Sequence, residues 1–324
     1  MFEKIRFIGR HLNKTGKVYF SFSGTGFEFK VKPNKSQFEI NISLESDLKE
    51  HPFQYLGVYI DDEFYSKEKI GGSDQKIKLT LNHTKPIIVR IIKLNEVYLS
   101  AIHLKDITLS GAELLDVEPS NRPLVGFFGD SITCGYGLLD YGGNEFKMET
   151  EDFSKTYAYL ACFSLKLDYS VVARSGISMA LPIWVDKLIG EVYDTVDMYE
   201  KCKEEKTLDY AVINLGANDN GALNNSKNKE EDLKLFKNKY LDFVERIIKD
   251  NPKVKIVMCY NALPVANVIS DAIKDVYKII STCFKNKILL LELVPNQEGA
   301  NCHPYYAAHE ENAIKLANAI KELR

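Results

Sequence analysis

The chain has 324 residues, of which 45% are hydrophobic and 27% charged, and its 42 basic and 45 acidic side chains leave a formal net charge of -3. This composition excludes a disordered chain, a collagen and a disulfide-dense miniprotein. The balanced charge gives no electrostatic case for nucleic acid or an anionic membrane as a partner. The length favours two domains of ordinary size.

Residues 1–115 predict a domain built from short strands. Aromatic and β-branched residues alternate with polar ones, and Pro, Gly, Asn and Asp fill the intervals, in 18–32, 37–44, 55–61, 76–82, 86–94 and 101–111. The first segment reads as a hairpin around Gly24-Thr25-Gly26. Short strands at this spacing, without a long helical pattern, predict an N-terminal β-sandwich domain of jelly-roll-like type.

The pattern changes after a short polar linker at 116–122. Near-continuous apolar runs then occur at 124–129, 169–173, 210–216, 255–260 and 288–293. Such runs predict strands that are buried on both faces. Helical periodicity appears in 231–249 and 305–323. Residues 123–324 therefore predict an α/β catalytic domain with an open parallel sheet, and such sheets bind ligands beyond the carboxyl ends of their strands.

Residues with catalytic chemistry follow these predicted strands. Ser131 comes after the first strand, Gly176 after the second, Asn218 after the third and His303 after the fifth. A serine becomes a good nucleophile only when a base takes its proton, and acyl transfer also needs donors aimed at the developing oxyanion. Each segment alone has an ordinary interpretation as a cap, a turn or a loop. Together the four predict a serine hydrolase site at one edge of the sheet.

In the order Ser, Gly, Asn, His, these residues resemble the SGNH (GDSL-like) hydrolases, and the resemblance covers 121–324. It implies an SGNH-type parallel sheet flanked by helices. It also implies that Ser131 is the nucleophile and His303 the general base. The oxyanion hole would consist of the backbone N–H groups of Ser131 and Gly176 and the side chain of Asn218.

The preceding β-sandwich makes nearly the whole chain similar to carbohydrate esterase family 2, the acetyl xylan esterases and polysaccharide deacetylases. The segments that carry this likeness are 20–27, 89–94, the nucleophile block 129–137 and the run from His303-Pro304 to His309. The resemblance implies a serine esterase that removes O-acetyl groups from xylan- or glucomannan-type oligo- or polysaccharides. We expect His309 itself to be structural.

One expected residue is missing. Related enzymes carry an aspartate two or three positions before the catalytic histidine, where this chain has Asn301 and Ala300. The natural interpretation is a Ser-His dyad whose imidazole is oriented by a carbonyl oxygen, with Asn301 as a possible orienting residue and Glu298 as the alternative. We expect Asp130 and Asp219 to organise their loops by local hydrogen bonds rather than to act in catalysis.

Substrate contacts are less strongly marked. Sugars stack on aromatic faces, so Trp184 and Tyr136 are candidate substrate-binding residues, with Tyr260 a weaker one; packing in the core is an equal alternative for Trp184. No metal-ligand set and no phosphate-binding loop is visible, so we expect neither a metal nor a cofactor. The alternatives are an SGNH lipase or thioesterase, which no long apolar lid supports, and a non-catalytic glycan-binding protein with a decayed site.

The sequence also bears on the compartment. No run approaches the roughly 18 apolar residues of a membrane span, and no signal peptide is visible. A cytoplasmic protein is expected, although a trimmed secreted chain would look the same. The scattered cysteines are interpreted as buried free thiols; they are Cys134, Cys162, Cys202, Cys259, Cys283 and Cys302.

Overall fold

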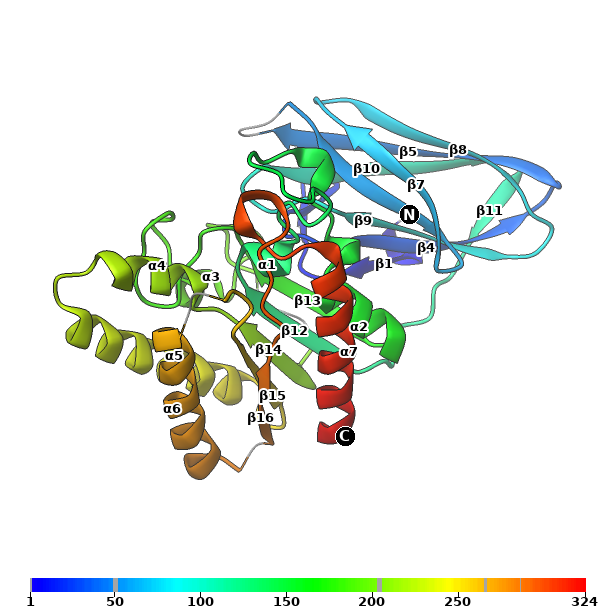
Figure 1. Cartoon of the computed structure of the whole chain (residues 1–324). Helices are drawn as coiled ribbons and strands as arrows, with labels where there is room; N and C mark the ends of the chain where they lie inside the picture. The colour runs from blue at the N-terminus through cyan, green and yellow to red at the C-terminus, as the bar shows by residue number, and fades with distance from the viewer. Residues whose placement is uncertain (1, 49–51, 203–205, 265–266, 286) are drawn as a thin grey trace. The chain divides into compact units, whose positions relative to one another are not determined.

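The computed structural model describes residues 2–48, 52–202, 206–264, 267–285 and 287–324. The chain divides into two compact units (Figure 1). The first comprises Met1–Asn121 and Thr195–Lys203, and the second comprises Arg122–Asp194 and Glu204–Arg324. The sequence predicts a linker at 116–122 and a catalytic domain that includes 195–203, whereas this segment belongs to the first unit.

Two antiparallel sheets form the first unit, which begins with the short 3-10 helix η1 (Phe2–Lys4). The first sheet contains, in spatial order, β1 (Ile5–Ile8), β4 (Gly26–Pro33), β9 (Ile87–Lys93), β6 (Gln54–Ile60) and β7 (Glu63–Ile70), and β11 (Ala112–Leu115) pairs with β4. The second contains β2 (Leu12–Lys14), β3 (Lys17–Phe20), β10 (Ser100–Ser110), β5 (Gln37–Leu48) and β8 (Gln75–Asn82).

A single apolar core fills the first unit, and strands of both sheets contribute to it. On β8, for example, Ile77, Leu79 and Leu81 are buried while the residues between them are not. This alternation is what a strand with one buried face requires, because successive side chains point to opposite faces. The predicted β-sandwich is confirmed.

The predicted hairpin at 18–32 is wrong. Strand β3 pairs with β2 and β10, whereas β4 pairs with β1, β9 and β11 in the other sheet. In the turn between them, the N–H of Thr25 donates to the carbonyl of Phe22 (3.2 Å). Alternating hydrophobicity does not distinguish a hairpin from two strands in different sheets, because a strand in either sheet buries one face.

Strand β7 was not predicted because its sequence, EFYSKEKI, is mostly polar, as suits a strand at a sheet edge.

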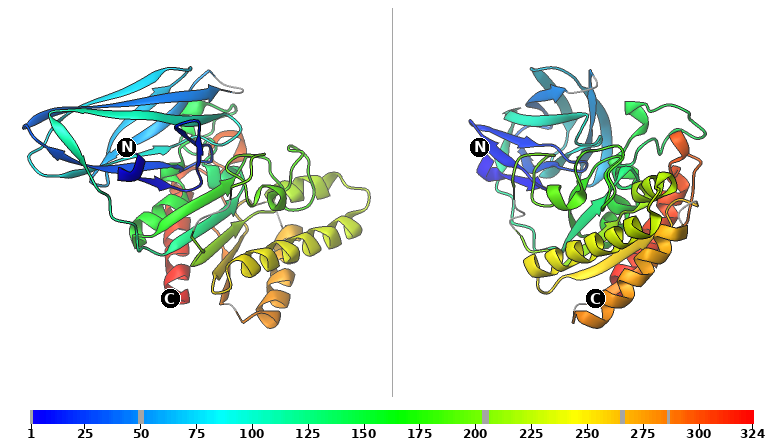
Figure 2. Two further views of the ribbon diagram at one scale, coloured as in Figure 1. Left: turned by 180° about the vertical axis from the view of Figure 1, so that it is seen from behind. Right: turned by 90° about the vertical axis from the view of Figure 1, so that its left-hand side faces the viewer.

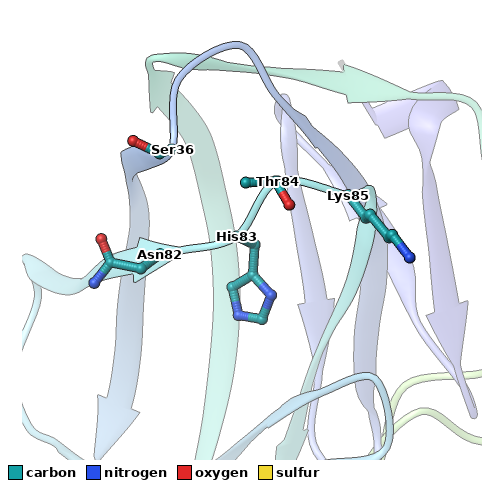
Figure 3. Close-up of a pocket in the computed structure, with 5 residues that line it drawn as sticks. All are labelled: Ser36, Asn82, His83, Thr84 and Lys85. Atoms are coloured by element: carbon teal, nitrogen blue, oxygen red, sulfur yellow. The ribbon is translucent and has the colours of Figure 1, made fainter.

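A polar hollow of about 360 Å³ lies between the β4–β5 and β8–β9 connections (Figure 3). Its lining consists of polar side chains, namely Ser36, Asn82, His83, Thr84 and Lys85. All of these are at least partly exposed, and none belongs to the residues predicted for the site.

Asp197 attaches the segment Thr195–Lys203 to the first unit. Its buried carboxylate accepts the hydroxyl of Tyr19 (2.6 Å) and the backbone N–H groups of Tyr199 (2.7 Å) and Glu200 (2.8 Å). Two further contacts support the attachment: Val196 is buried against Tyr19 and Ala101, and Arg10 donates to the carbonyl of Thr195 (2.9 Å). Nothing in the local sequence marks this segment, since its hydrogen bonds to Tyr19 and Arg10 join residues 178 and 185 positions apart.

A parallel sheet forms the centre of the second unit, in the order β13 (Asp168–Ala173), β12 (Leu124–Gly129), β14 (Tyr210–Asn214), β15 (Lys255–Tyr260) and β16 (Ile288–Glu292). Every residue of β12 and β14 is buried, which explains their continuous apolar sequences. The predicted α/β fold is confirmed.

Helices cover both faces of this sheet. Helices α2 (Tyr157–Leu165) and α7 (Tyr306–Leu323) pack together on one face, and α5 (Lys229–Asp250) and α6 (Asn267–Cys283) pack together on the other (Figure 1, Figure 2). Helix α5 buries Phe236, Tyr240, Phe243 and Ile247, at the helical spacing seen in the sequence. The short elements are α1 (Ser131–Cys134), η2 (Met148–Thr150), η3 (Phe153–Lys155), α3 (Ile189–Val192), α4 (Ala217–Asn225) and η4 (Ala300–Cys302).

His309 joins α7 to the start of α2. Its Nδ1 accepts the backbone N–H of Tyr157 (3.2 Å), and the two rings are stacked with centroids 6.1 Å apart. The hydroxyl of Tyr157 in turn lies 2.9 Å from Oγ1 of Thr133. Burial, with a smaller contribution from His303, lowers the pKa of His309 to about 3. His309 is therefore a neutral structural acceptor.

The six cysteines are all free. Cys134, Cys162 and Cys259 are buried, whereas Cys283 and Cys302 are exposed. The expectation of buried thiols is therefore wrong for Cys283 and Cys302.

Among the residues described, no helix has the length and apolar character needed to cross a membrane.

Replacing Asp197 by Ala should lower the free energy of unfolding by about 2–4 kcal/mol, because three donors lose a charged acceptor in a buried place. Urea denaturation measures this change. Asp74→Ala is the control: the Asp74 side chain is 70% exposed and pairs with Lys105, so its loss should cost less than about 0.5 kcal/mol. Equal effects for the two variants would contradict the attachment.

The neutral His309 should make stability fall in acid. Its folded pKa of about 3 lies below the unfolded value of about 6.5, so the unfolded chain binds one more proton between these values. Stability is therefore complete above pH 6.5 and decreases as the pH falls. Between pH 7.5 and 5 the wild type should lose about 2 kcal/mol more than His309→Gln, which keeps an acceptor. Identical pH dependences in urea denaturation would rule this out.

Candidate active site

Three neighbouring strands bring three of the predicted residues to the same edge of the sheet. At the carboxyl end of β12, Gly129 pairs with Ala173 of β13 on one side and Asn214 of β14 on the other. Ser131, Gly176 and Asn218 follow these three paired residues within two to four positions. Because the chain leaves β12 for β13 on one side and reaches β14 on the other, this is the switch point at which open α/β sheets bind ligands.

A tight turn presents Ser131 at the first position of α1. Asp130 caps this turn, since its carboxylate accepts the N–H of Ile132 (3.0 Å). Position 129 must be glycine, because a Cβ there would lie 2.0 Å from Oγ1 of Thr133. Gly135 ends the turn in the left-handed region (φ 89°) and donates to the carbonyl of Ser131. Asp130 therefore has a structural role, as expected.

The loop before α7 carries His303 to the serine. Nε2 of His303 lies 2.8 Å from Oγ of Ser131. Backbone hydrogen bonds hold the loop against the segment that follows the nucleophile turn: Ala300 donates to Gly137 (3.2 Å), Asn301 to Gly143 (2.8 Å) and Tyr306 to Leu138 (3.0 Å). A Cβ at Gly137 would lie 2.5 Å from Cβ of Ala300, so glycine permits this close approach.

The orientation of the imidazole follows from its second nitrogen. Nδ1 of His303 lies 3.1 Å from the carbonyl oxygens of both Ala300 and Asn301. Carbonyl oxygens only accept, so Nδ1 carries the proton and Nε2 presents its lone pair to the hydroxyl of Ser131. Burial lowers the pKa of His303, and the two carbonyls partly oppose that shift. The imidazole is consequently a neutral acceptor at neutral pH.

The residues considered as replacements for the missing acid occupy other positions. Asn301 has left-handed backbone angles (φ 50°, ψ 43°), and its side chain points to Tyr136, whose hydroxyl accepts from Nδ2 (2.9 Å). Its contribution to His303 is thus through the backbone carbonyl. The carboxylate of Glu298 accepts the side-chain amide of Asn296 (2.8 Å) instead, which gives no support to Glu298 as the orienting group.

The predicted oxyanion donors meet the chemical requirement. Within the described chain, the backbone N–H groups of Ser131 and Gly176 donate to no other protein group. The side-chain amide of Asn218 donates to the carbonyl of Ile177 (2.9 Å), which fixes the amide and leaves its second hydrogen for a ligand. Three fixed donors of this kind can stabilise negative charge that develops on a carbonyl oxygen.

Asp219 ties together the loops that carry two of these donors. Its buried carboxylate accepts the backbone N–H groups of Met179 (2.9 Å), Ala180 (2.8 Å) and Leu181 (2.9 Å). Burial raises the pKa of Asp219, and the three N–H donors act against that rise. The carboxylate thus holds the segment after Gly176 beside α4. The only sign of this role in the sequence is the position of Asp219 next to Asn218.

The aromatic candidates differ in their surroundings. Trp184 is 73% exposed, so it does not belong to the core, and a Cβ at Gly176 would lie 2.7 Å from its Cβ. Tyr136 contacts the ring of His303, with centroids 4.3 Å apart. The ring of Tyr260 lies under the ammonium of Lys274 (5.1 Å). Within the described ranges, no group of His, Cys, Asp and Glu side chains suits a metal ion.

Comparison with solved structures extends the likeness to both units. A family two carbohydrate esterase from Clostridium thermocellum in complex with cellohexaose has a TM-score of 0.87 at 19% identity, over 98% of each chain. The acetyl xylan esterase Est2A from the rumen bacterium Butyrivibrio proteoclasticus gives 0.82 at 20%, over 99% of this chain and 96% of the other. A Corynascus thermopiles (Myceliophthora fergusii) carbohydrate esterase family 2 enzyme with a carbohydrate binding domain gives 0.80 at 25%, over 98% and 99%.

Sequence comparison agrees with these structures. The cellulase/esterase CelE of Acetivibrio thermocellus is 25% identical in an alignment of 226 residues that covers 65% of this chain and 27% of CelE. This chain therefore matches only about a quarter of that relative's length. The model of the GDSL-like lipase/acylhydrolase family matches residues 127–323, more than half of the chain and the whole of the site described above. The chain belongs to the GDSL-like lipase/acylhydrolase family.

Proposed function

We propose that this protein is a serine esterase that removes O-acetyl groups from acetylated oligo- or polysaccharides of the xylan or glucomannan type. The observation that carries the proposal is the contact between Oγ of Ser131 and Nε2 of His303 at 2.8 Å, with Nδ1 bonded to carbonyl oxygens. This geometry gives a hydroxyl nucleophile and a neutral base of the correct tautomer. The sugar is inferred from the family two carbohydrate esterases that share the fold.

The proposed reaction forms and then hydrolyses an acyl-enzyme. Nε2 of His303 takes the hydroxyl proton as Oγ of Ser131 attacks the acetyl carbonyl. The N–H groups of Ser131 and Gly176 and the amide of Asn218 bind the oxyanion. The intermediate collapses to acetyl-Ser131 as the C–O bond to the sugar breaks, and the imidazolium gives its proton to the departing sugar oxygen. Water, deprotonated by His303, then attacks the acetyl carbonyl. As the C–O bond to Ser131 breaks, the imidazolium returns its proton to Oγ, and the acetic acid released ionises to acetate.

Trp184 is the proposed platform for the sugar. It is 73% exposed and adjoins Gly176, which supplies one of the oxyanion donors. An indole face exposed to water offers a large apolar surface to the C–H face of a pyranose, with little conformational entropy to lose. Because Trp184 adjoins a donor rather than the nucleophile, it would hold the sugar while the ester carbonyl reaches Ser131.

The hydrolytic roles are tested with p-nitrophenyl acetate and acetylated xylo-oligosaccharides. Ser131→Ala should lose the covalent route, so its remaining rate should exceed that of the uncatalysed reaction in water by only about 10³–10⁴-fold.

Asn218→Ala should lower kcat by about 10²–10³ with KM nearly unchanged, since an oxyanion donor acts on the transition state. Ser164→Ala is the control, because that hydroxyl donates to a helix carbonyl on α2 and should not affect the rate.

Three results would overturn parts of this proposal separately. Wild-type activity in Ser131→Ala would place the chemistry elsewhere. A wild-type enzyme that hydrolyses p-nitrophenyl acetate but prefers longer acyl chains to acetylated sugars would instead indicate a lipase or thioesterase. Sugar binding without any ester hydrolysis would indicate a glycan-binding protein.

Trp184→Ala should raise KM for an acetylated xylo-oligosaccharide about tenfold, equivalent to about 1.4 kcal/mol of binding, because the sugar loses its stacking surface. The kinetic constants for p-nitrophenyl acetate, which has no sugar, should stay within about twofold. Phe163→Ala is the matched control: that ring is 49% exposed on α2 and should leave both substrates unaffected. Equal losses for the two substrates would show that Trp184 supports the loop rather than the sugar.

A further inference from the structure

The base at this site lacks the charge that usually stabilises it. In a Ser-His-Asp triad the carboxylate stabilises the imidazolium that forms when the base takes the serine proton. Here the partners of His303 Nδ1 are two neutral carbonyl groups. They fix the tautomer, but they bring no negative charge. Another group that favours a cationic imidazole should therefore matter more in this site than in a triad.

Tyr136 is placed to supply that interaction. Its ring lies over the imidazole of His303, with centroids 4.3 Å apart and planes inclined by 32°. The π face of a tyrosine attracts a cation within about 6 Å of the ring centroid. A second ring, that of Phe146, packs against Tyr136, with ring centroids 4.6 Å apart and planes inclined by 30°. This packing helps to hold the tyrosine in position.

The turn that carries the nucleophile also fixes the direction of this ring. The N–H of Tyr136 donates to the carbonyl of Ser131 (3.1 Å). Tyr136 stands between Gly135 (φ 89°) and Gly137 (φ 58°), both in the left-handed region. A Cβ at Gly135 would lie 2.7–3.0 Å from its neighbours. The backbone path that aims the ring therefore depends on glycines on both sides.

The hydroxyl of Tyr136 reaches the other side of the base. It accepts Nδ2 of Asn301 (2.9 Å), and the carbonyl of the same Asn301 accepts from Nδ1 of His303. Asn301 is held at φ 50°, in the left-handed region, where asparagine is enriched among the residues other than glycine. The side-chain bond to Tyr136 thus helps to keep in place the residue whose carbonyl orients the imidazole.

We infer that Tyr136 is a positioning residue of this esterase rather than a sugar platform: its ring face stabilises the imidazolium of His303, and its hydroxyl fixes the Asn301 carbonyl. The inference rests on the proposed function. Among the titratable groups that face His303, Ser131 is its hydroxyl partner, Tyr136 is neutral, and His309 on α7 is neutral above about pH 3. Burial lowers the pKa of His303, and the carbonyls of Ala300 and Asn301 oppose that shift.

The ring is tested with Tyr136→Leu, assayed with p-nitrophenyl acetate so that sugar contacts play no part. We expect kcat to fall about 10–100-fold with KM within about twofold, and the acid limb of the pH profile of kcat/KM to move to lower pH, because the imidazolium loses its aromatic partner. Tyr141→Leu is the matched control. That tyrosine lies in the same loop, 66% exposed, with its ring against Tyr305, and its loss should change kcat less than twofold.

The hydroxyl is tested by a double-mutant cycle that does not depend on Tyr136→Leu folding well. Tyr136→Phe and Asn301→Ala should each lower kcat by less than about tenfold without moving the acid limb. The double variant should lose no more than the larger single loss, because both changes remove the same hydrogen bond. Circular dichroism and thermal melting check the folding of every variant.

The outcomes separate this inference from the proposed function. Additive losses in the cycle, a Tyr136→Leu effect confined to KM, or an unmoved acid limb in that variant would overturn the positioning role while Ser131 and His303 still catalyse. Absence of ester hydrolysis in the wild type, or full activity in Ser131→Ala, would instead overturn the proposed function.

Discussion

The hydrogen bonds between Nδ1 of His303 and the carbonyls of Ala300 and Asn301 are the interaction on which the site depends. They decide which nitrogen faces Ser131, and hence whether the imidazole can accept a proton. Backbone atoms supply both acceptors, so the orientation of a single side chain requires an entire loop to keep its path. That path requires left-handed backbone angles at Asn301 and a close approach of Gly137 to Ala300.

Neutral partners also set the charge state of the site. A carboxylate beside Nδ1 would favour the protonated imidazole, whereas the two carbonyls only partly oppose the burial that lowers the pKa of His303. In the free enzyme, His303 would therefore remain neutral and able to accept a proton down to a lower pH. The imidazolium formed during the reaction is correspondingly less stable, so the barrier depends more on the oxyanion donors and on the surrounding aromatic ring. The low pKa of the free base and the lower stability of the imidazolium both follow from the burial of an imidazole whose Nδ1 has neutral partners.

Sequence reasoning succeeded where local pattern decides the structure. Apolar runs identified the strands β12, β13 and β14, and the positions directly after these strands identified Ser131, Gly176 and Asn218 as neighbours. It failed where contacts between residues far apart in the sequence determine the structure. The chain changes sheets between β3 and β4, Asp219 clamps a loop some 40 residues earlier, and Tyr136 turns towards His303 rather than to solvent. None of these has a periodic or compositional signature, because each depends on a partner elsewhere in the chain.

The segment Thr195–Lys203 makes the two units less modular than their sequences suggest. The chain passes between them three times rather than once. A shortened protein that begins at Arg122 would keep this segment but lose its partners, so Val196 would meet water and Asp197 would lose Tyr19. The reverse fragment would leave Tyr19 and Ala101 uncovered. Exchange of the sandwich between relatives as an independent cassette should therefore succeed only when this nine-residue segment is exchanged with it.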